Sequence, residues 1–221
     1  MIHIYPAMMG IDEEQIHKII LLKPSVTRVH IDVMDGHFVP SITHGSERIN
    51  ECTKKEELFV WLHLMIVDIP RFFAMYKVPE ESLVSFHIEA VADVFDSVKT
   101  IKEKKCIPSV AISPKTAVKE IEPFLSVVRH VLVMSVEPGF SGQPFLPTVI
   151  SKIDALVQYR QKHALQFRIG IDGGINKDNI GYLAKKGVDD FAISSGIFKQ
   201  PDPQKTLLEL HHIVQLLSHN N

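Results

Sequence analysis

The sequence alternates regularly between short apolar runs and longer segments with helical spacing, and this alternation constrains the fold more than any other feature. The apolar runs fall at 2–6, 26–34, 57–66, 82–88, 106–112, 129–136, 166–172 and 189–194. The segments with helical spacing or helix-start signals fall at 12–23, 45–52, 70–76, 90–105, 114–124, 148–163, 176–186 and 203–217. Alternation of this kind predicts a parallel sheet. Roughly eight units in 221 residues favour a closed (β/α)₈ TIM barrel, one domain over residues 1–221.

A doubly wound open sheet is the alternative fold. It would usually carry a GxGxxG or GxxxxGK[ST] turn after its first strand, and neither motif occurs there.

Charge and cysteine content narrow the functional classes. The formal net charge is −2, so nothing indicates a nucleic-acid or membrane partner. Two cysteines are too few for a disulfide framework, and a reducing cytoplasm is expected. The N-terminal residues lack the pattern of a signal peptide, and no apolar run approaches the ~18–20 residues of a membrane span.

Polar side chains stand at the ends of three predicted strands. His30 and Asp32 alternate with apolar residues in the second run, His63 does so in the third, and Asp172 ends the seventh. If the apolar faces pack on the helices, these four side chains point into the barrel at its carboxyl end. Two histidines and two carboxylates can bind zinc, iron, manganese or cobalt. Alternatively, each is a capping group or a polar group of the barrel core.

Three methionines are predicted to lie just above these polar residues. Met34 and Met65 each follow an inward polar residue by two positions, and Met134 is inward near the end of the sixth strand. Such a layer would exclude water from a reactive intermediate. Methionine also serves as ordinary core filler.

The loops after the last two strands carry the residue types of a phosphate site. Gly173 and Gly174 follow the seventh strand, and Ser194 and Ser195 end the eighth. In (β/α)₈ barrels these loops commonly bind phosphate, although a plain glycine turn and a helix cap have the same composition. The segment 138–143 (PGFSGQ) is typical of a mobile lid with glycine hinges.

Five blocks of the sequence resemble the signature blocks of the ribulose-phosphate 3-epimerase family. They are HIDVMDGHFVPSIT, HLMIVDIPRF, FHIEA, VLVMSVEPGFSGQPF and IDGGI, in the family's order. The resemblance implies that His30, Asp32, His63 and Asp172 bind one divalent metal ion, and that Asp32 and Asp172 are the acid/base pair. It implies a ketose phosphate substrate, bound by His63, Gly139, Phe140, Ser141, Gly142, Asp172, Gly173, Gly174, Ser194 and Ser195.

The residues suit this chemistry. Inverting a carbon next to a ketone requires removal of a proton from one face and delivery of another to the opposite face, which two opposed carboxylates can do. The intermediate is an enediolate, whose charge a divalent cation stabilises as a Lewis acid. No cofactor for electron or group transfer is required, and we expect a homo-oligomer.

Two segments depart from the family pattern. After the first strand the family usually has PSIL-SAD, with a serine that contacts substrate, and this chain has PAMMGID at 6–12, with Ala7 in place of that serine. At the end of the eighth strand the family usually has AGSAIF, and this chain has ISSGIF at 193–198. Both segments are more similar to the related allulose-6-phosphate 3-epimerases. We therefore expect conversion of ribulose 5-phosphate to xylulose 5-phosphate, with allulose 6-phosphate as the second candidate substrate. A non-catalytic sugar-phosphate-binding protein is a third hypothesis. A lyase or decarboxylase is a fourth, and it would need an inward lysine that no strand end carries.

Overall fold

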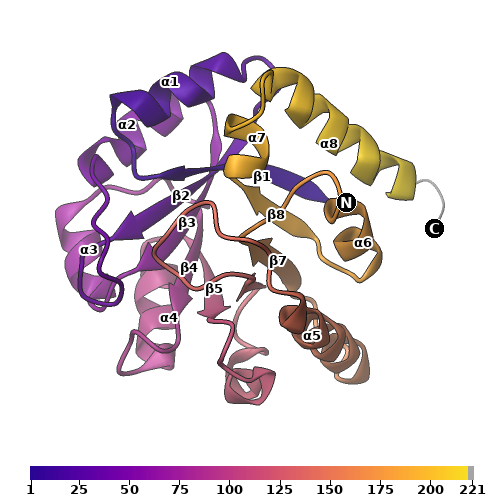
Figure 1. Cartoon of the computed structure of the whole chain (residues 1–221). Coiled ribbons are helices and arrows are strands. Elements are labelled where there is room, and N and C mark those ends of the chain that lie inside the picture. The colour runs from indigo at the N-terminus through magenta and orange to yellow at the C-terminus, as the bar shows by residue number, and fades with distance from the viewer. Residues whose placement is uncertain (219–221) are drawn as a thin grey trace.

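Period-two alternation in the apolar runs produces eight parallel strands, and these close into a barrel because β1 pairs with both β2 and β8 (Figure 1). The computed structural model describes residues 1–218, so the last three residues of the expected domain lie outside it. The (β/α)₈ prediction is confirmed. The strands are β1 (His3–Met9), β2 (Arg28–Met34), β3 (Phe59–Met65), β4 (Leu83–His87), β5 (Ile107–Ile112), β6 (His130–Met134), β7 (Arg168–Asp172) and β8 (Asp190–Ile193).

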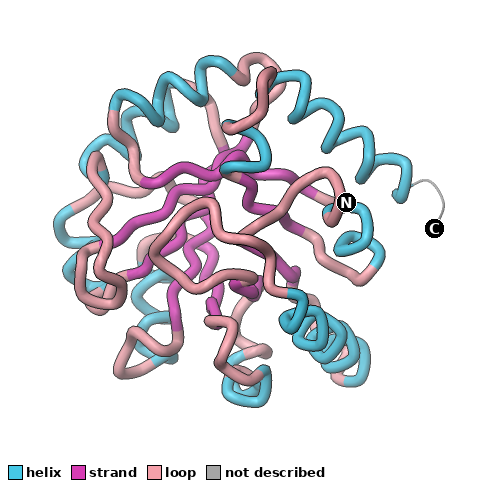
Figure 2. Tube along the Cα trace, viewed as in Figure 1, coloured by secondary structure: helices cyan, strands magenta, loops and turns pink. Residues whose placement is uncertain are grey.

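The helices form an outer ring around the strands (Figures 1 and 2). They are α1 (Glu13–Leu21), α2 (Ile49–Lys55), α3 (Ile69–Met75), α4 (Val94–Glu103), α5 (Ile150–Lys162), α6 (Ile180–Lys185), α7 (Ser195–Phe198) and α8 (Pro203–Ser218). Single 3₁₀ turns are η1 (Ser46–Arg48), η2 (Val118–Glu120), η3 (Glu122–Phe124) and η4 (Pro147–Val149). Asp12 caps α1 as predicted, accepting from the Gln15 backbone N at 2.9 Å. None of the helices in residues 1–218 has the length and apolarity that crossing a membrane requires.

The two faces of each strand separate the core into an outer and an inner part. On β2, Val29, Ile31 and Val33 belong to the large cluster that includes the α1 residue Ile19. The inner cluster contains Trp61 and other side chains of the barrel interior. The prediction that the apolar faces point outward is therefore confirmed, and His30 and Asp32 lie on the inward face of β2.

Two predicted elements were wrong. The segment 114–124 forms the 3₁₀ turns η2 and η3 instead of an α-helix, and Pro123 within η3 lacks the backbone N–H that an α-helix would need there. The first strand does not end at Pro6. It continues to Met9, because residues 7–9 pair with β2, and a proline removes only its own hydrogen-bond donor.

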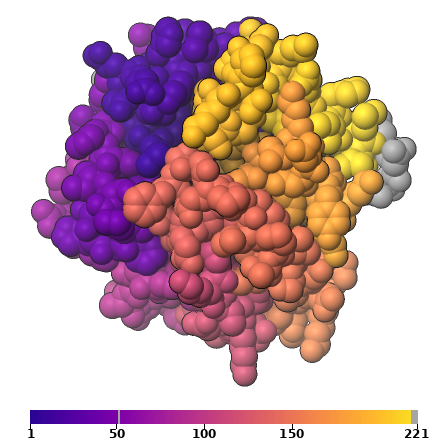
Figure 3. All heavy atoms as spheres, viewed as in Figure 1, coloured from indigo at the N-terminus to yellow at the C-terminus, as the bar shows by residue number. Residues whose placement is uncertain are grey.

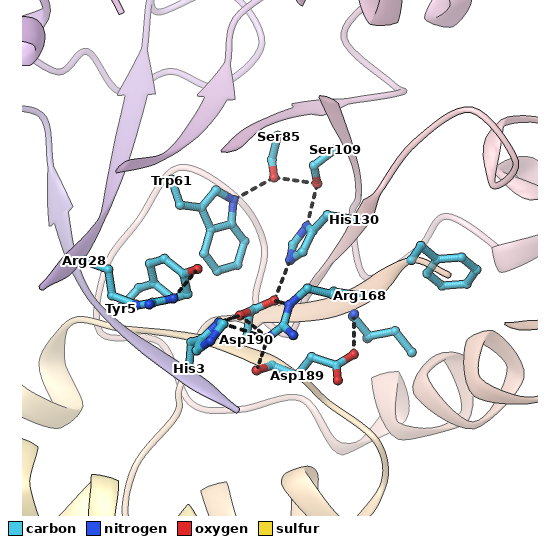
Figure 4. Close-up of polar contacts among 12 residues, drawn as sticks. His3, Tyr5, Arg28, Trp61, Ser85, Ser109, His130, Arg168, Asp189 and Asp190 are labelled. Atoms are coloured by element: carbon cyan, nitrogen blue, oxygen red, sulfur yellow. Dashed lines mark hydrogen bonds and ion pairs between the residues drawn. The ribbon is translucent and has the colours of Figure 1, made fainter. Parts of the chain in front are cut away.

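Buried polar side chains fill the amino-terminal end of the barrel (Figure 4). Ser109 Oγ lies 2.7 Å from His130 Nδ1, and His130 Nε2 lies 3.5 Å from the Asp190 carboxylate. Arg168 donates to both oxygens of Asp190, at 2.6 and 2.7 Å, and His3 Nδ1 lies 3.0 Å from Asp190 Oδ1. Burial opposes ionisation of Asp190, but these partners outweigh it and hold its pKa well below the usual range. The charge of Asp190 is therefore compensated inside the barrel.

Replacing Asp190 with alanine is expected to lower the free energy of unfolding by about 3 kcal/mol. This is the lower end of the range for a broken buried ion pair, because Arg168 is partly exposed. Urea unfolding, monitored by circular dichroism, measures this change in the free energy of unfolding. Asp154→Ala is the matched control, since the Asp154–Lys186 pair is partly exposed and should contribute little to stability. Equal losses for the two variants would contradict the prediction.

Candidate active site

The four polar residues predicted at the strand ends meet at one point inside the barrel. Asp32 on β2 is in register with His63 on β3, and Asp172 approaches from β7. His63 Nδ1 lies 2.9 Å from Asp32 Oδ1 and 3.6 Å from Asp172 Oδ2. His30 Nε2 lies 3.2 and 3.6 Å from the same two oxygens. Closure of the barrel thus brings residues from distant parts of the chain into contact.

These four residues fit a divalent metal ion. One ligand atom from each of His30, Asp32, His63 and Asp172 lies within 4.8 Å of the others. A tetrahedral ion with arms of about 2.1 Å has ligand atoms about 3.4 Å apart, close to the measured separations. Two imidazole nitrogens and two carboxylate oxygens favour zinc, iron, manganese or cobalt over calcium or magnesium.

The same contacts determine the charges of the cluster. Burial would lower the pKa of His63, but hydrogen bonds to Asp172 and Asp32 raise it to about 9. Burial would raise the pKa of Asp32, but its contacts with His30 and His63 hold that pKa well below the usual range. Without a metal, the proton on His63 therefore compensates the charge of Asp32.

A pocket partly open to solvent lies directly above the cluster. His30 and His63 are fully buried beneath it. None of the described residues that line it is a lysine. Its lining does not include His63, but it includes both carboxylates, the three methionines and the remaining predicted substrate-binding residues: Gly139, Phe140, Ser141, Gly142, Gly173, Gly174, Ser194 and Ser195.

Comparison with known proteins identifies the family. The model of the ribulose-phosphate 3-epimerase family matches residues 3–198. The chain belongs to this family. It is 38% identical to the ribulose-phosphate 3-epimerase of Methanocaldococcus jannaschii over 82% of this chain and 76% of that one. It is 31% identical to the Escherichia coli (strain K12) ribulose-phosphate 3-epimerase over 86% of this chain and 85% of that one. The protein is thus an epimerase.

Solved structures with low sequence identity show the same barrel. KGPDC from Streptococcus mutans has a TM-score of 0.68 at 13% identity, covering 97% of this chain and 98% of that one. Phosphoribosyl anthranilate isomerase from Thermus thermophilus has a TM-score of 0.65 at 10% identity, covering 98% and 100%. At these identities the likeness concerns the fold alone.

Methionines of the epimerase lie over the cluster, but not as one packed layer. Met34 and Met65 are in register on β2 and β3 and pack with Val39. Met134 belongs to the inner barrel cluster instead. All three are nearly inaccessible to solvent and line the cavity, so a shielding role stays a prediction.

The loop between β6 and α5 lies across the front of the barrel in Figures 1 and 3. It is joined to the loop after β2, because Ser41 Oγ donates to the Gly139 carbonyl at 2.7 Å. Gly139 has φ 104°, and an added Cβ would lie 2.9 Å from Val39 Cβ. Glycine is therefore required where the two loops cross. Whether the loop opens as a lid stays a prediction.

The sequence interpretation missed two residues beside the cluster. His87 ends β4, pointing inward, and its Nε2 lies 2.9 Å from His63 Nε2. Glu89 follows two positions later and lies 3.0 Å from His87 Nδ1. The available signal was the His-x-Glu spacing at a strand end, which repeats the spacing of His30 and Asp32.

Proposed function

We propose that this epimerase inverts carbon 3 of D-ribulose 5-phosphate to give D-xylulose 5-phosphate, with one divalent metal ion and two carboxylates. The observation that carries the proposal is the convergence of Asp32 and Asp172, from strands β2 and β7, on one pair of histidines at the floor of one cavity. The names of the relatives support the same substrate.

In this mechanism one carboxylate removes the proton from carbon 3, and the other group, which enters the reaction as the protonated acid, delivers its proton to the opposite face of the enediolate. The two residues exchange roles in the reverse direction. His30 and His63 would hold the metal together with these carboxylates, and the bound ion would supply Lewis-acid stabilisation of negative charge. Met34, Met65 and Met134 would exclude water from the intermediate.

The phosphate would bind at the loops after β7 and β8. Gly173 and Gly174 have φ of 114° and 63°, which lets the backbone turn tightly at the cavity. Asn179 Nδ2 donates to the Gly174 carbonyl at 2.9 Å and holds this turn in place. Ser194 and Ser195 line the same cavity and offer hydroxyl donors. Phe140, Ser141 and the flanking glycines would close over the sugar.

A six-carbon substrate, D-allulose 6-phosphate, is the second candidate. Ala7 lines the cavity from β1 and cannot form a side-chain hydrogen bond where the family usually has serine. Ser194 and Ser195 also line the cavity and belong to the other departing segment. Both differences lie where the substrate would bind, and neither affects the four residues of the cluster.

Deuterium exchange at carbon 3 tests the proposal. Metal-replete protein is incubated in D₂O with ribulose 5-phosphate and, in parallel, allulose 6-phosphate, and the products are read by NMR. Exchange with inversion of the pentose is the expected result. Strong preference for the hexose would assign the substrate to the second candidate. Binding of both sugar phosphates without exchange would favour the non-catalytic hypothesis.

Self-association stays a prediction. Gel filtration with light scattering tests it, and a mass equal to that of one chain would contradict it.

A further inference from the structure

A chain of hydrogen bonds leads away from the metal-binding cluster on the side opposite the carboxylates. His63 presents Nδ1 to Asp32 and Asp172, and its other nitrogen, Nε2, lies 2.9 Å from His87 Nε2. His87 Nδ1 lies 3.0 Å from Glu89 Oε2. Both imidazole rings are fully buried, so no solvent competes for these contacts.

When a metal is bound, the positions of the protons determine which atom donates in each hydrogen bond between His63, His87 and Glu89. A histidine that gives its Nδ1 lone pair to a metal carries its proton on Nε2. His63 Nε2 must then donate, and His87 Nε2 must accept. A neutral His87 that accepts at Nε2 carries its proton on Nδ1, which donates to Glu89. Only an acceptor at the Glu89 position is compatible with this arrangement.

Glu89 is built as such an acceptor. Its Oε1 accepts from the Ser113 backbone N at 2.8 Å and also from the Thr116 hydroxyl. Lys152 on α5 holds this loop by donating to the carbonyls of Ser113, at 2.8 Å, and Thr116. Burial would raise the pKa of Glu89, but hydrogen bonds from His87 and Thr116 lower it to about 2. The carboxylate is therefore ionised and saturated with donors.

We propose that His87 and Glu89 are positioning residues, which act through His63 by fixing its tautomer and ring orientation so that Nδ1 is free to bind the metal. Neither residue lines the substrate cavity. The inference rests on the proposed function in one respect, since it requires that the cluster bind a divalent ion. If His87 and Glu89 served only to pack the interior, the direction of their hydrogen bonds would not matter.

Glu89→Gln separates these two roles. Each Glu89 oxygen faces donors, and glutamine has only one oxygen. If its amide nitrogen faces His87 Nδ1, the donors reverse along the chain, and His63 carries its proton on Nδ1, where it blocks the metal. If the amide nitrogen faces Ser113 instead, it meets a backbone N–H that cannot accept. The first arrangement removes the metal-binding tautomer, and the second keeps it only with an unfavourable donor–donor contact at the Ser113 backbone N, at nearly unchanged side-chain volume.

The experiment measures zinc affinity of the metal-free full-length protein by competition with a chromophoric chelator. Glu89→Gln is expected to weaken zinc binding by about 10- to 100-fold, and Glu89→Asp, which retains the charge, to recover part of the loss. Glu120→Gln is the matched control, because Glu120 is exposed on η2 and its carboxylate accepts from the Ala117 backbone N rather than from an imidazole. The zinc affinity of Glu120→Gln should equal that of wild type. Long-range ¹H–¹⁵N spectra of the imidazoles should place the His63 proton on Nε2 in zinc-loaded wild type.

Two results would overturn the inference. One is zinc affinity of folded Glu89→Gln within twofold of wild type, which would leave the metal-dependent function intact and reduce Glu89 to a packing role. The other is a wild-type protein that binds no zinc, manganese, iron or cobalt, which would overturn the metal site as well. Thermal unfolding of the metal-free variants shows whether they fold as wild type does. If Glu89→Gln does not fold, the zinc-loaded Glu89→Asp protein serves as the test. Full zinc affinity of Glu89→Asp together with a His63 proton on Nδ1 would contradict the proposed proton direction.

Discussion

Replacing Asp32 or Asp172 with asparagine is expected to lower kcat for epimerisation by at least about a hundredfold, and by up to about 10⁴-fold, the range for loss of an acid or base. Asparagine keeps the shape of the side chain but cannot accept a proton from carbon. Each variant also removes a charged ligand atom from the cluster. Inversion of ribulose 5-phosphate, followed by a coupled assay at saturating metal, measures the loss.

The matched control for these two variants is Asp35→Asn. Asp35 follows β2 directly, but it does not line the substrate cavity, and its carboxylate accepts from the His37 backbone N. Its kcat should remain within about twofold of wild type, since surface substitutions rarely affect a distant site. Near-normal turnover in either Asp32→Asn or Asp172→Asn would contradict the two-base assignment.

Removing the metal is expected to abolish exchange at carbon 3 and to leave the barrel folded. Without the ion, the proton on His63 still faces the carboxylates through the short contacts described above, so the apoprotein keeps favourable contacts within this cluster. Dialysis against a chelator, followed by the exchange assay and circular dichroism, tests both parts. Full activity after the metal content has fallen to zero would contradict the proposal.

The metal ions that restore activity should be those that the nitrogen and oxygen ligand atoms of the cluster favour. Zinc, manganese, iron or cobalt should return activity, while calcium should not, because two of the four ligand atoms are imidazole nitrogens.

Metal affinity should also fall as the pH falls below about 9, by roughly tenfold per unit where one proton is displaced. The proton on His63, with a pKa raised to about 9, competes with the metal, whereas Asp32 stays ionised throughout this range. Affinity independent of pH between 6 and 8 would exclude competition by this proton.

Local patterns predicted most of the elements because they depend on backbone geometry within a few residues. Asp12 caps α1 where the sequence predicted it, and the period of two in β2 placed His30 and Asp32 on the inward face. Prediction failed where local and non-local preferences disagreed. Pro6 resembles a strand end, but pairing with β2 continues β1 to Met9. Pro114 suggested a helix start, but the segment forms two 3₁₀ turns, the second of which contains Pro123.

The sequence by itself determined the barrel and the four inward residues of the cluster, because strand period and strand order are encoded locally along the chain. Only the tertiary structure decided how close these residues come and what surrounds them. The contact of Asp172 with His30 and His63 depends on closure between β1 and β8. The chain from His63 through His87 to Glu89 depends on the register of β3 and β4 and on the loop held by Lys152. Hydrogen-bond direction and side-chain contact across strands arise from packing, which the spacing of residues in one segment does not specify.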